Sequence, residues 1–128
     1  MADINVSVTV DTVNITQENV ATTVVLTDDN GDHDITPGDS ETFDIVTGIN
    51  KTIKFTPSSQ DGTTVTFDSF EQENEVNAFA ELPSNANEWT GTTASESVTG
   101  TELFKIYFTV EGKGQFYLDP ELQVDQDG

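Results

Sequence analysis

A strongly alternating stretch near the C-terminal end of the chain, Glu102–Val124, most constrains what this sequence can fold into. Apolar residues occupy every second position of Phe104–Val110, which is the period of a β-strand with one buried face. The glycines of Gly112–Gly114 then permit the positive φ angles of a tight hairpin turn. A second apolar strand follows and breaks at Asp119-Pro120, because proline cannot donate to a ladder. The rest of the chain must therefore supply a second apolar sheet face to cover this hairpin.

Shorter strand-like patterns occur along the rest of the chain, separated by turn signals. The further strands that we predict are Ile4–Val10, Val20–Leu26, Thr42–Val46, Lys51–Thr56, Thr64–Phe67 and, at a sheet edge, Thr92–Thr99. A change in the phase of the apolar residues predicts a bulge or a crossover near Asp11-Thr12. The least regular part of the chain, residues 71–91, is predicted to contain a short helical turn at Val76–Glu81.

About seven to nine short strands without a long helix are typical of an all-β fold with two packed sheets. We therefore predict a single β-sandwich domain of mostly antiparallel strands over residues 1–124. Residues 125–128 are predicted to form a flexible C-terminal tail.

The charge of the chain excludes several classes of partner. The 128 residues carry 24 acidic side chains against four basic ones, for a net charge of −20. Such a surface repels the phosphates of nucleic acids and of anionic membranes. The first residues include neither a basic segment nor a continuous apolar run, so no signal peptide and no transmembrane segment are predicted. We expect a cytoplasmic or particle-associated protein, unless a leader was removed.

Several short motifs resemble those of cupredoxin-like (immunoglobulin-like) β-sandwich domains. In that family a Pro-Gly-Asp turn precedes a central strand, and a hairpin of the form Y-x-(F/Y)-x-V and D-P-x-(L/I)-x-V closes the fold. The matching segments are Thr36–Ser40 with the strand Thr42–Val46, then Ile53–Phe55, Phe104–Val110 and Leu118–Val124. The resemblance covers roughly Val20–Val124 and implies the sandwich fold.

The copper site of that family has no counterpart in this sequence. Copper-binding members use two histidines and a cysteine, often with an axial methionine. This chain has no cysteine, and His33 and Met1 are its only histidine and methionine. The resemblance therefore implies a sandwich without copper, and the lack of cysteine also excludes disulfides and thiol catalysis.

An acidic turn over Asp28–Asp34 is the best candidate for a metal site. Alternating oxygen-bearing side chains resemble the first half of a calcium-binding loop. The candidate ligands are Asp28, Asn30, Asp32 and Asp34. The match is incomplete, because His33 stands where such a loop has glycine and Asp39 where it has glutamate. The alternative is a solvated acidic hairpin turn, and we expect no cofactor other than this calcium ion.

The sequence contains no recognisable catalytic motif. A serine nucleophile would have to rely on His33, and no Gly-x-Ser-x-Gly motif occurs. Among so many carboxylates nothing singles out a catalytic pair. We therefore expect a protein that is not an enzyme.

Two aromatic side chains are candidates for ligand binding. Trp89 lies in an irregular, asparagine-rich segment, and Tyr107 points away from the apolar side of its strand. Together with Tyr117 they could form a platform for a carbohydrate. The alternative is that Trp89 closes one end of the sandwich and that Tyr107 packs beneath the irregular segment.

The N-terminal strand is the candidate for assembly. It is rich in β-branched residues and lacks proline, so it could pair with the sheet of a neighbouring subunit. Its apolar residues are Ile4, Val6, Val8 and Val10. The alternative is that it is simply the first strand of the sandwich.

The sequence therefore favours a non-catalytic structural or assembly protein, a subunit or decoration module of a larger particle or filament. Such a protein would associate with itself or with a protein partner. The alternative is a β-sandwich module that binds a carbohydrate or a protein, with calcium assisting.

Overall fold

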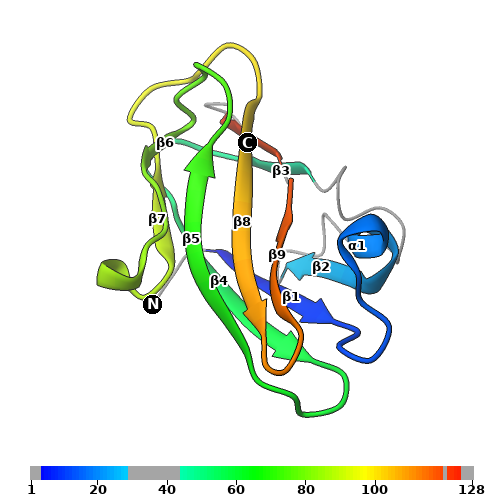
Figure 1. The fold of residues 1–128 in the computed structure, drawn as a ribbon. Helices are drawn as coiled ribbons and strands as arrows, with labels where there is room; N and C mark the ends of the chain where they lie inside the picture. The colour runs from blue at the N-terminus through cyan, green and yellow to red at the C-terminus, as the bar shows by residue number, and fades with distance from the viewer. Residues whose placement is uncertain (1–3, 29–43, 120, 125–128) are drawn as a thin grey trace.

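The computed structural model describes residues 4–28, 44–119 and 121–124, which build two β-sheets packed face to face (Figure 1). The strands of the first sheet are β1 (Ile4–Val10), β2 (Val24–Asp28), β4 (Thr52–Ser59), β6 (Phe79–Glu81) and β7 (Thr90–Thr93). They lie in the order β2-β1-β4-β7-β6. Within this sheet β1 is antiparallel to β2 and parallel to β4, so β1 is an interior strand.

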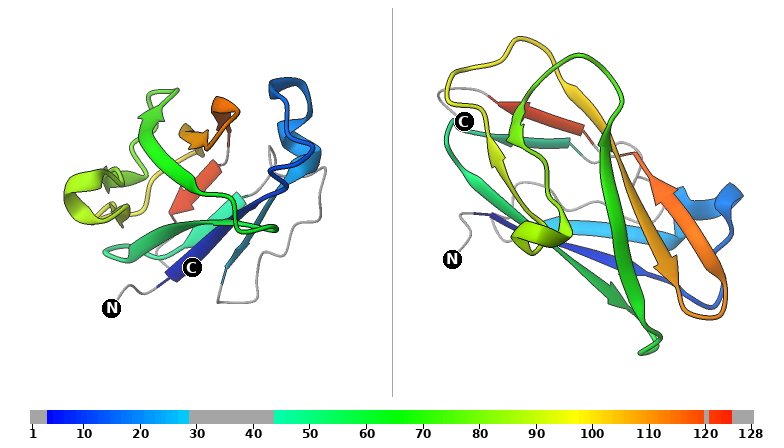
Figure 2. Two further views of the ribbon diagram at one scale, coloured as in Figure 1. Left: turned by 60° about the horizontal axis from the view of Figure 1, so that its bottom comes forward. Right: turned by 60° about the vertical axis from the view of Figure 1, so that its left-hand side comes forward.

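The second sheet contains the predicted C-terminal hairpin. Its strands are β3 (Asp44–Thr47), β5 (Val65–Gln72), β8 (Glu102–Val110), β9 (Gly114–Leu118) and β10 (Glu121–Val124). The order is β3-β10-β8-β5, and β9 also pairs with β8. The long strands β5 and β8 run side by side, and the strands of the first sheet cross behind them at an angle (Figures 1 and 2).

The predicted two-sheet β-sandwich is confirmed. The described residues form ten strands, of which β1–β4 and β3–β10 pair in parallel and the remaining pairs are antiparallel. Ten strands exceed the expected seven to nine because the irregular part of the sequence contributes the short strand β6 and because the last predicted strand is divided into β9 and β10. None of the helices in the described part of the chain has the length and apolar character needed to cross a membrane.

The segment after β1 differs from the prediction. In place of a bulge or a crossover to the other sheet, the chain forms the 3-10 turn η1 (Gln17–Asn19) and the single helical turn α1 (Val20–Thr23). It then returns beside β1 as β2, so the expected strand Val20–Leu26 begins only at Val24. The backbone N–H of Asp11 donates to the carbonyl of Thr23 at 2.7 Å, which closes this connection within one sheet.

Residues 71–93 also differ from the prediction. The helical turn lies at η3 (Asn85–Asn87), whereas β6 occupies part of the segment where that turn was expected. The predicted edge strand Thr92–Thr99 is instead β7, which ends at Thr93 and lies between β4 and β6. Thr93 is 1% exposed and donates its hydroxyl to the carbonyl of Gly48 at 2.9 Å, so a polar residue is accommodated in the interior.

A buried carboxylate joins the two sheets. Glu102, at the start of β8, is 1% exposed, and its Oε1 accepts the backbone N–H of Phe79 in β6 at 2.8 Å. Burial raises the pKa of Glu102, while the backbone N–H groups of Phe79 and Ala78 act in the opposite direction. These N–H groups satisfy the carboxylate, which would otherwise be costly to bury.

An extra residue in β5 shapes the aromatic part of the core. The register of β5 against β8 shifts between Phe67 and Ser69, which leaves Asp68 as a bulge. In a regular strand, residues three apart point to opposite faces, but the bulge turns Phe67 and Phe70 to the same buried side. Phe70 then contacts Phe55 of the first sheet, with the ring centroids 5.0 Å apart, and stacks on Phe104 at 6.2 Å.

We expect Phe70→Ala to lower the free energy of unfolding by about 3 to 5 kcal/mol, because it removes a ring that contacts both sheets and leaves a cavity. Chemical denaturation followed by circular dichroism measures the change. The neighbouring exposed variant Ser69→Ala is the control and should stay within about 0.5 kcal/mol of the parent. Equal stabilities of the two variants would contradict this account of the core.

Candidate functional site

The strand predicted to mediate assembly lies inside the sheet. Its residues Ile4, Val6, Val8 and Val10 are 0–3% exposed. Along its whole length β1 pairs with β4, and from Val6 to Val10 it pairs with β2 as well. The prediction that this strand pairs with a neighbouring subunit is therefore wrong, because both of its edges are occupied from Val6 to Val10. The alternative interpretation, that it is the first strand of the sandwich, is correct.

The candidate calcium ligands fall mostly outside the described residues. Asp28 is the last residue of β2. Asn30, Asp32 and Asp34 lie in the segment 29–43, outside the described residues, and the calcium site stays a prediction. Within the described ranges, no group of three or more His, Cys, Asp or Glu side chains is placed to hold a metal ion.

Trp89 and Tyr107 do not form one platform. Trp89 contacts Phe67 and Phe70, which point from β5 into the core. Tyr107 pairs with Ser69 of β5, whose side chain is exposed on the other side of the sheet. The two aromatic residues therefore belong to opposite faces of the second sheet and must be considered as separate sites.

The loop that carries Trp89 has an unusual backbone. Glu88 and Trp89 have φ angles of 56° and 62°, in the left-handed region that residues with large side chains rarely adopt. The backbone N–H of Trp89 donates to the carbonyl of Ser84 at 2.8 Å, and its carbonyl accepts the N–H of Phe55 at 2.9 Å. The indole stacks on Phe70 with an interplanar angle of 24°. The loop thus anchors a half-buried tryptophan firmly against the core.

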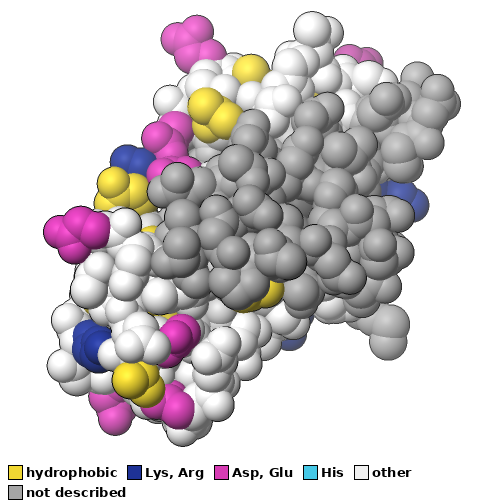
Figure 3. Space-filling view, turned by 90° about the vertical axis from the view of Figure 1, so that its right-hand side faces the viewer, with side chains coloured by type: hydrophobic (Ala, Val, Ile, Leu, Met, Phe, Trp, Pro, Cys, Tyr) yellow, Lys and Arg dark blue, Asp and Glu magenta, His cyan; other side chains and the backbone are white. Residues whose placement is uncertain are grey.

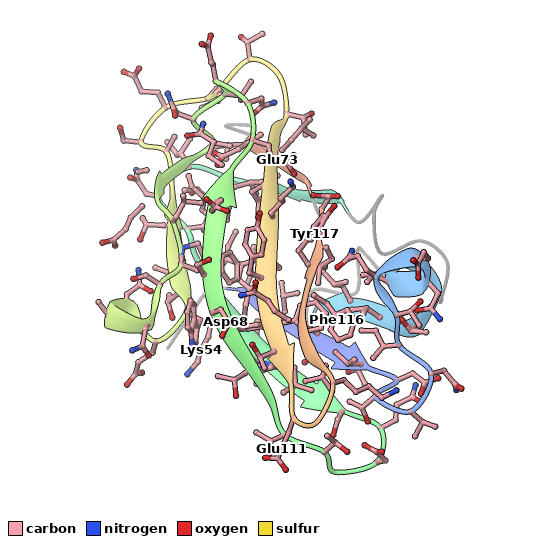
Figure 4. All side chains as sticks on the ribbon, in the orientation of Figure 1. Lys54, Asp68, Glu73, Glu111, Phe116 and Tyr117 are labelled. Carbon is pink, nitrogen blue, oxygen red and sulfur yellow. The ribbon has the colours of Figure 1, made fainter. Side chains whose placement is uncertain are left out.

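A groove with a volume of about 400 Å³ lies beside this loop. Its lining comes from β4 and from the loop around η3: Lys54, Thr56, Pro57, Asn85, Glu88 and Trp89 contribute to it. Figure 4 shows Lys54 on the side of the molecule where this loop projects. Of the predicted ligand-binding residues, only Trp89 belongs to this groove.

Tyr107 belongs to a surface on the outer side of the second sheet, which we call the tyrosine face. It consists of Lys105, Tyr107 and Thr109 of β8 together with Gln115 and Tyr117 of β9. The rings of Tyr107 and Tyr117 are 5.7 Å apart on directly paired positions. The ammonium of Lys105 lies 4.7 Å from the centre of the Tyr117 ring, within the range of a cation–π contact.

The acidic residues of β5 hold this face in place. Asp68 accepts hydrogen bonds from the hydroxyl of Thr109 at 2.6 Å and from the amide of Gln115 at 3.0 Å. A hydrogen bond with the carboxylate of Glu71 raises the pKa of Tyr107. Hydrogen bonds to β5 thus order Tyr107, Thr109 and Gln115 on the tyrosine face.

A pair of carboxyl groups lies at one end of the tyrosine face. Burial raises the pKa of Asp119 to about 6, and a hydrogen bond with Glu73 and its like charge act in the same direction. Lys105 partly opposes them, and its Nζ lies 3.9 Å from a carboxylate oxygen of Glu73. Figure 4 shows Glu73 near the start of β8, just past the end of β5, and Tyr117 on β9.

Sequence reasoning named both Tyr107 and Tyr117 but not their direct pairing, nor the charged and polar side chains around them. A signal was available, because the turn over Glu111–Lys113 pairs Val110 with Gly114, and counting back from it pairs Tyr107 with Tyr117. The proximity of Asp119 and Glu73 carries no such signal, because it depends on the pairing of β5 with β8 across a long stretch of chain.

We expect Asp119→Asn to stabilise the protein more at neutral pH than at acidic pH. The pKa of Asp119 in the folded protein lies above the ordinary value of 3.8, so the folded state favours the protonated carboxyl group. The stability that the protonated Asp119 contributes is fully present below the ordinary pKa and is lost as the pH rises through about 6. After discounting for solvent screening, the advantage of the variant should grow by about 1 kcal/mol between about pH 4 and about pH 7.5.

Denaturant titrations of both proteins at the two pH values measure this difference. Glu73→Gln removes the like charge and should have a smaller effect in the same direction. A stability difference that does not change with pH would contradict the assigned carboxyl pair.

No protein-family model matches this sequence, and no curated protein sequence matches it. The structure is similar to the crystal structure of the inclusion body protein PixA from Burkholderia cenocepacia J2315, with a TM-score of 0.66. The match covers 95% of this chain and 94% of that chain, and the two sequences are 10% identical. The likeness shows a shared two-sheet fold, while the cupredoxin-like classification stays a prediction.

Proposed function

We propose that this protein is a non-catalytic structural protein whose copies associate into a larger particle or filament through the tyrosine face. The observation that carries the proposal is the ordered surface around Tyr107 and Tyr117 on the outside of the second sheet. The end-to-end likeness to a protein described as an inclusion body protein supports an assembly role.

The edges of the second sheet favour a contact through its face. Beside β9, the side chain of Gln17 accepts the N–H of Tyr117 at 3.3 Å and donates to its carbonyl at 3.5 Å, so it occupies the edge as another strand would. At the other side, β5 ends the sheet with a bulge and with the acidic residues Asp68 and Glu71. Bulges and charges are devices that discourage strand addition.

The tyrosine face has the properties of a protein contact surface. Tyrosine is enriched in interfaces because it buries a large area, offers a hydroxyl and loses little conformational freedom. Here Tyr107 and Tyr117 are already held by each other and by Lys105 and Glu71, which reduces the entropy lost on association. A second copy of the same chain is the partner that we propose.

The high negative charge sets the conditions for such an assembly. Two copies at −20 repel each other, and Asp and Glu side chains lie around the described part of the face drawn in Figure 3. Salt screens this repulsion within a few ångströms at about 1 M. Protonation of Asp119, whose pKa is raised to about 6, removes charge at the end of the tyrosine face itself. Association should therefore increase with salt and with falling pH.

We expect the parent protein to form larger species as salt is raised and as the pH falls through about 6. Multi-angle light scattering across protein concentration measures the mass, and electron microscopy shows whether the product is regular. The double variant Tyr107→Ser with Tyr117→Ser should remain smaller under the same conditions, because its contact surface is lost. The association constant should fall at least about tenfold for the loss of two such side chains.

Val13→Ser is the matched control, because Val13 is 64% exposed and lies outside the tyrosine face. It should assemble like the parent. A strict monomer under every condition would overturn the assembly proposal, and assembly unaffected by the tyrosine substitutions would overturn the assigned face. Adding calcium or a chelator in the same experiment tests the predicted acidic turn.

A further inference from the structure

The groove beside Trp89 forms where β4 extends beyond its neighbour β7. β7 pairs with Thr52–Lys54 of β4, and the N–H of Phe55 still reaches the carbonyl of Trp89. β4 continues to Ser59, beyond Thr90, the first residue of the antiparallel strand β7. Because backbone groups two residues apart point the same way, the nitrogen of Pro57 lies on this open side, where the missing N–H costs no ladder hydrogen bond.

The backbone around Trp89 is specified in detail. The side-chain oxygen of Asn87 accepts the N–H of Ser84 at 2.7 Å and that of Thr90 at 3.1 Å, and its amide donates to the carbonyl of Leu82 at 3.2 Å. These bonds hold two consecutive non-glycine residues, Glu88 and Trp89, in the left-handed region. Such conformations persist only where the surroundings enforce them, and they concentrate at binding sites.

The groove combines an aromatic ring with separate polar groups. The indole of Trp89 stacks on Phe70 and remains partly exposed at the groove. The ammonium of Lys54 and the carboxylate of Glu88 line it, and neither makes an ion pair within residues 4–28, 44–119 and 121–124. Asn85 adds an amide, which offers both a donor and an acceptor.

This set of groups suits a polyhydroxylated ligand without net charge. The two charged side chains cancel within the groove, while the surrounding chain at −20 repels anions. A pyranose ring presents an apolar C–H face that packs on an aromatic ring, and it presents hydroxyl groups at its rim. Lys54, Glu88 and Asn85 can donate to or accept from those hydroxyls.

We propose that this groove is a binding site for a neutral saccharide, with the sugar ring against Trp89 and its hydroxyls on Lys54, Glu88 and Asn85. The site lies on the opposite side of the second sheet from the tyrosine face, so it is independent of the proposed assembly. Because the groove is open and shallow, we expect weak binding, with a Kd of about 1 mM.

The single tryptophan of the chain provides a direct readout, because all tryptophan fluorescence comes from Trp89. The experiment titrates the full chain with maltose, cellobiose, lactose and chitobiose while recording emission and the backbone amide signals by NMR. We expect saturable changes in emission for at least one disaccharide, and amide shifts confined to the groove around Thr56 and Asn85.

Variants separate binding from packing. Lys54→Met and Glu88→Gln should each weaken binding about tenfold, since each removes a hydrogen bond to a charged group. Lys51→Met changes an exposed lysine three residues earlier in the chain and should bind like the parent. Trp89→Phe keeps an aromatic ring for Phe70 to contact, so it should fold, and by NMR it should bind at least about tenfold more weakly.

The absence of saturable changes for all four sugars at tens of millimolar would overturn the proposal. So would binding that Lys54→Met and Glu88→Gln leave unchanged, or shifts that map outside the groove. Binding of the apolar dye ANS but of no sugar would also overturn the proposal. It would indicate that the groove is only an apolar patch beside Trp89.

Discussion

The bulge at Asp68 is the constraint on which much of the structure depends. By adding one residue to β5, it turns both Phe67 and Phe70 inward and directs the side chain of Asp68 outward. Phe70 then touches rings from both sheets and supports Trp89 from behind. Outside, the carboxylate of Asp68 anchors Thr109 of β8 and Gln115 of β9. One local irregularity thus organises the core on one side of the sheet and the tyrosine face on the other.

Local patterns predicted the elements whose signal is contained in a single stretch of sequence. The alternation of β8, its glycine-flanked turn and the alternation of β1 are of this kind, and all three are present in the structure. The bulge in β5 and the burial of Glu102 depend instead on contacts between segments that are far apart in the sequence. A glutamate at the start of a strand reads as a solvated residue, and only the approach of β6 supplies the N–H group that lets it be buried.

The assembly role predicted for β1 was wrong for the same reason, because the position of a strand in a sheet depends on contacts with distant segments. A β-branched, proline-free strand suits a sheet centre as well as a sheet edge, because propensity reflects packing and not position. Position depends on partners, and the parallel partner of β1 is β4, whose pairing Ile4–Ile53 spans much of the chain. For the candidate sites, the residue types Trp89 and Tyr107 were predictable, but their placement on opposite faces was not, because it follows from the register of β5 against β8.

The arrangement of the edges explains why a β-rich, acidic chain can present a contact surface without risking uncontrolled strand addition. An open edge offers backbone groups that match any other edge, whereas a face offers side chains that match only a complementary surface. Gln17 occupies the edge beside Tyr117, and Pro57 removes a donor from the open side of β4. In the described part of the chain, two partly exposed tyrosines are ordered on one face, and one partly exposed tryptophan lies beside a lysine and a glutamate in a groove. In both proposals, recognition therefore rests on side chains that the sheets hold in place and not on free backbone groups.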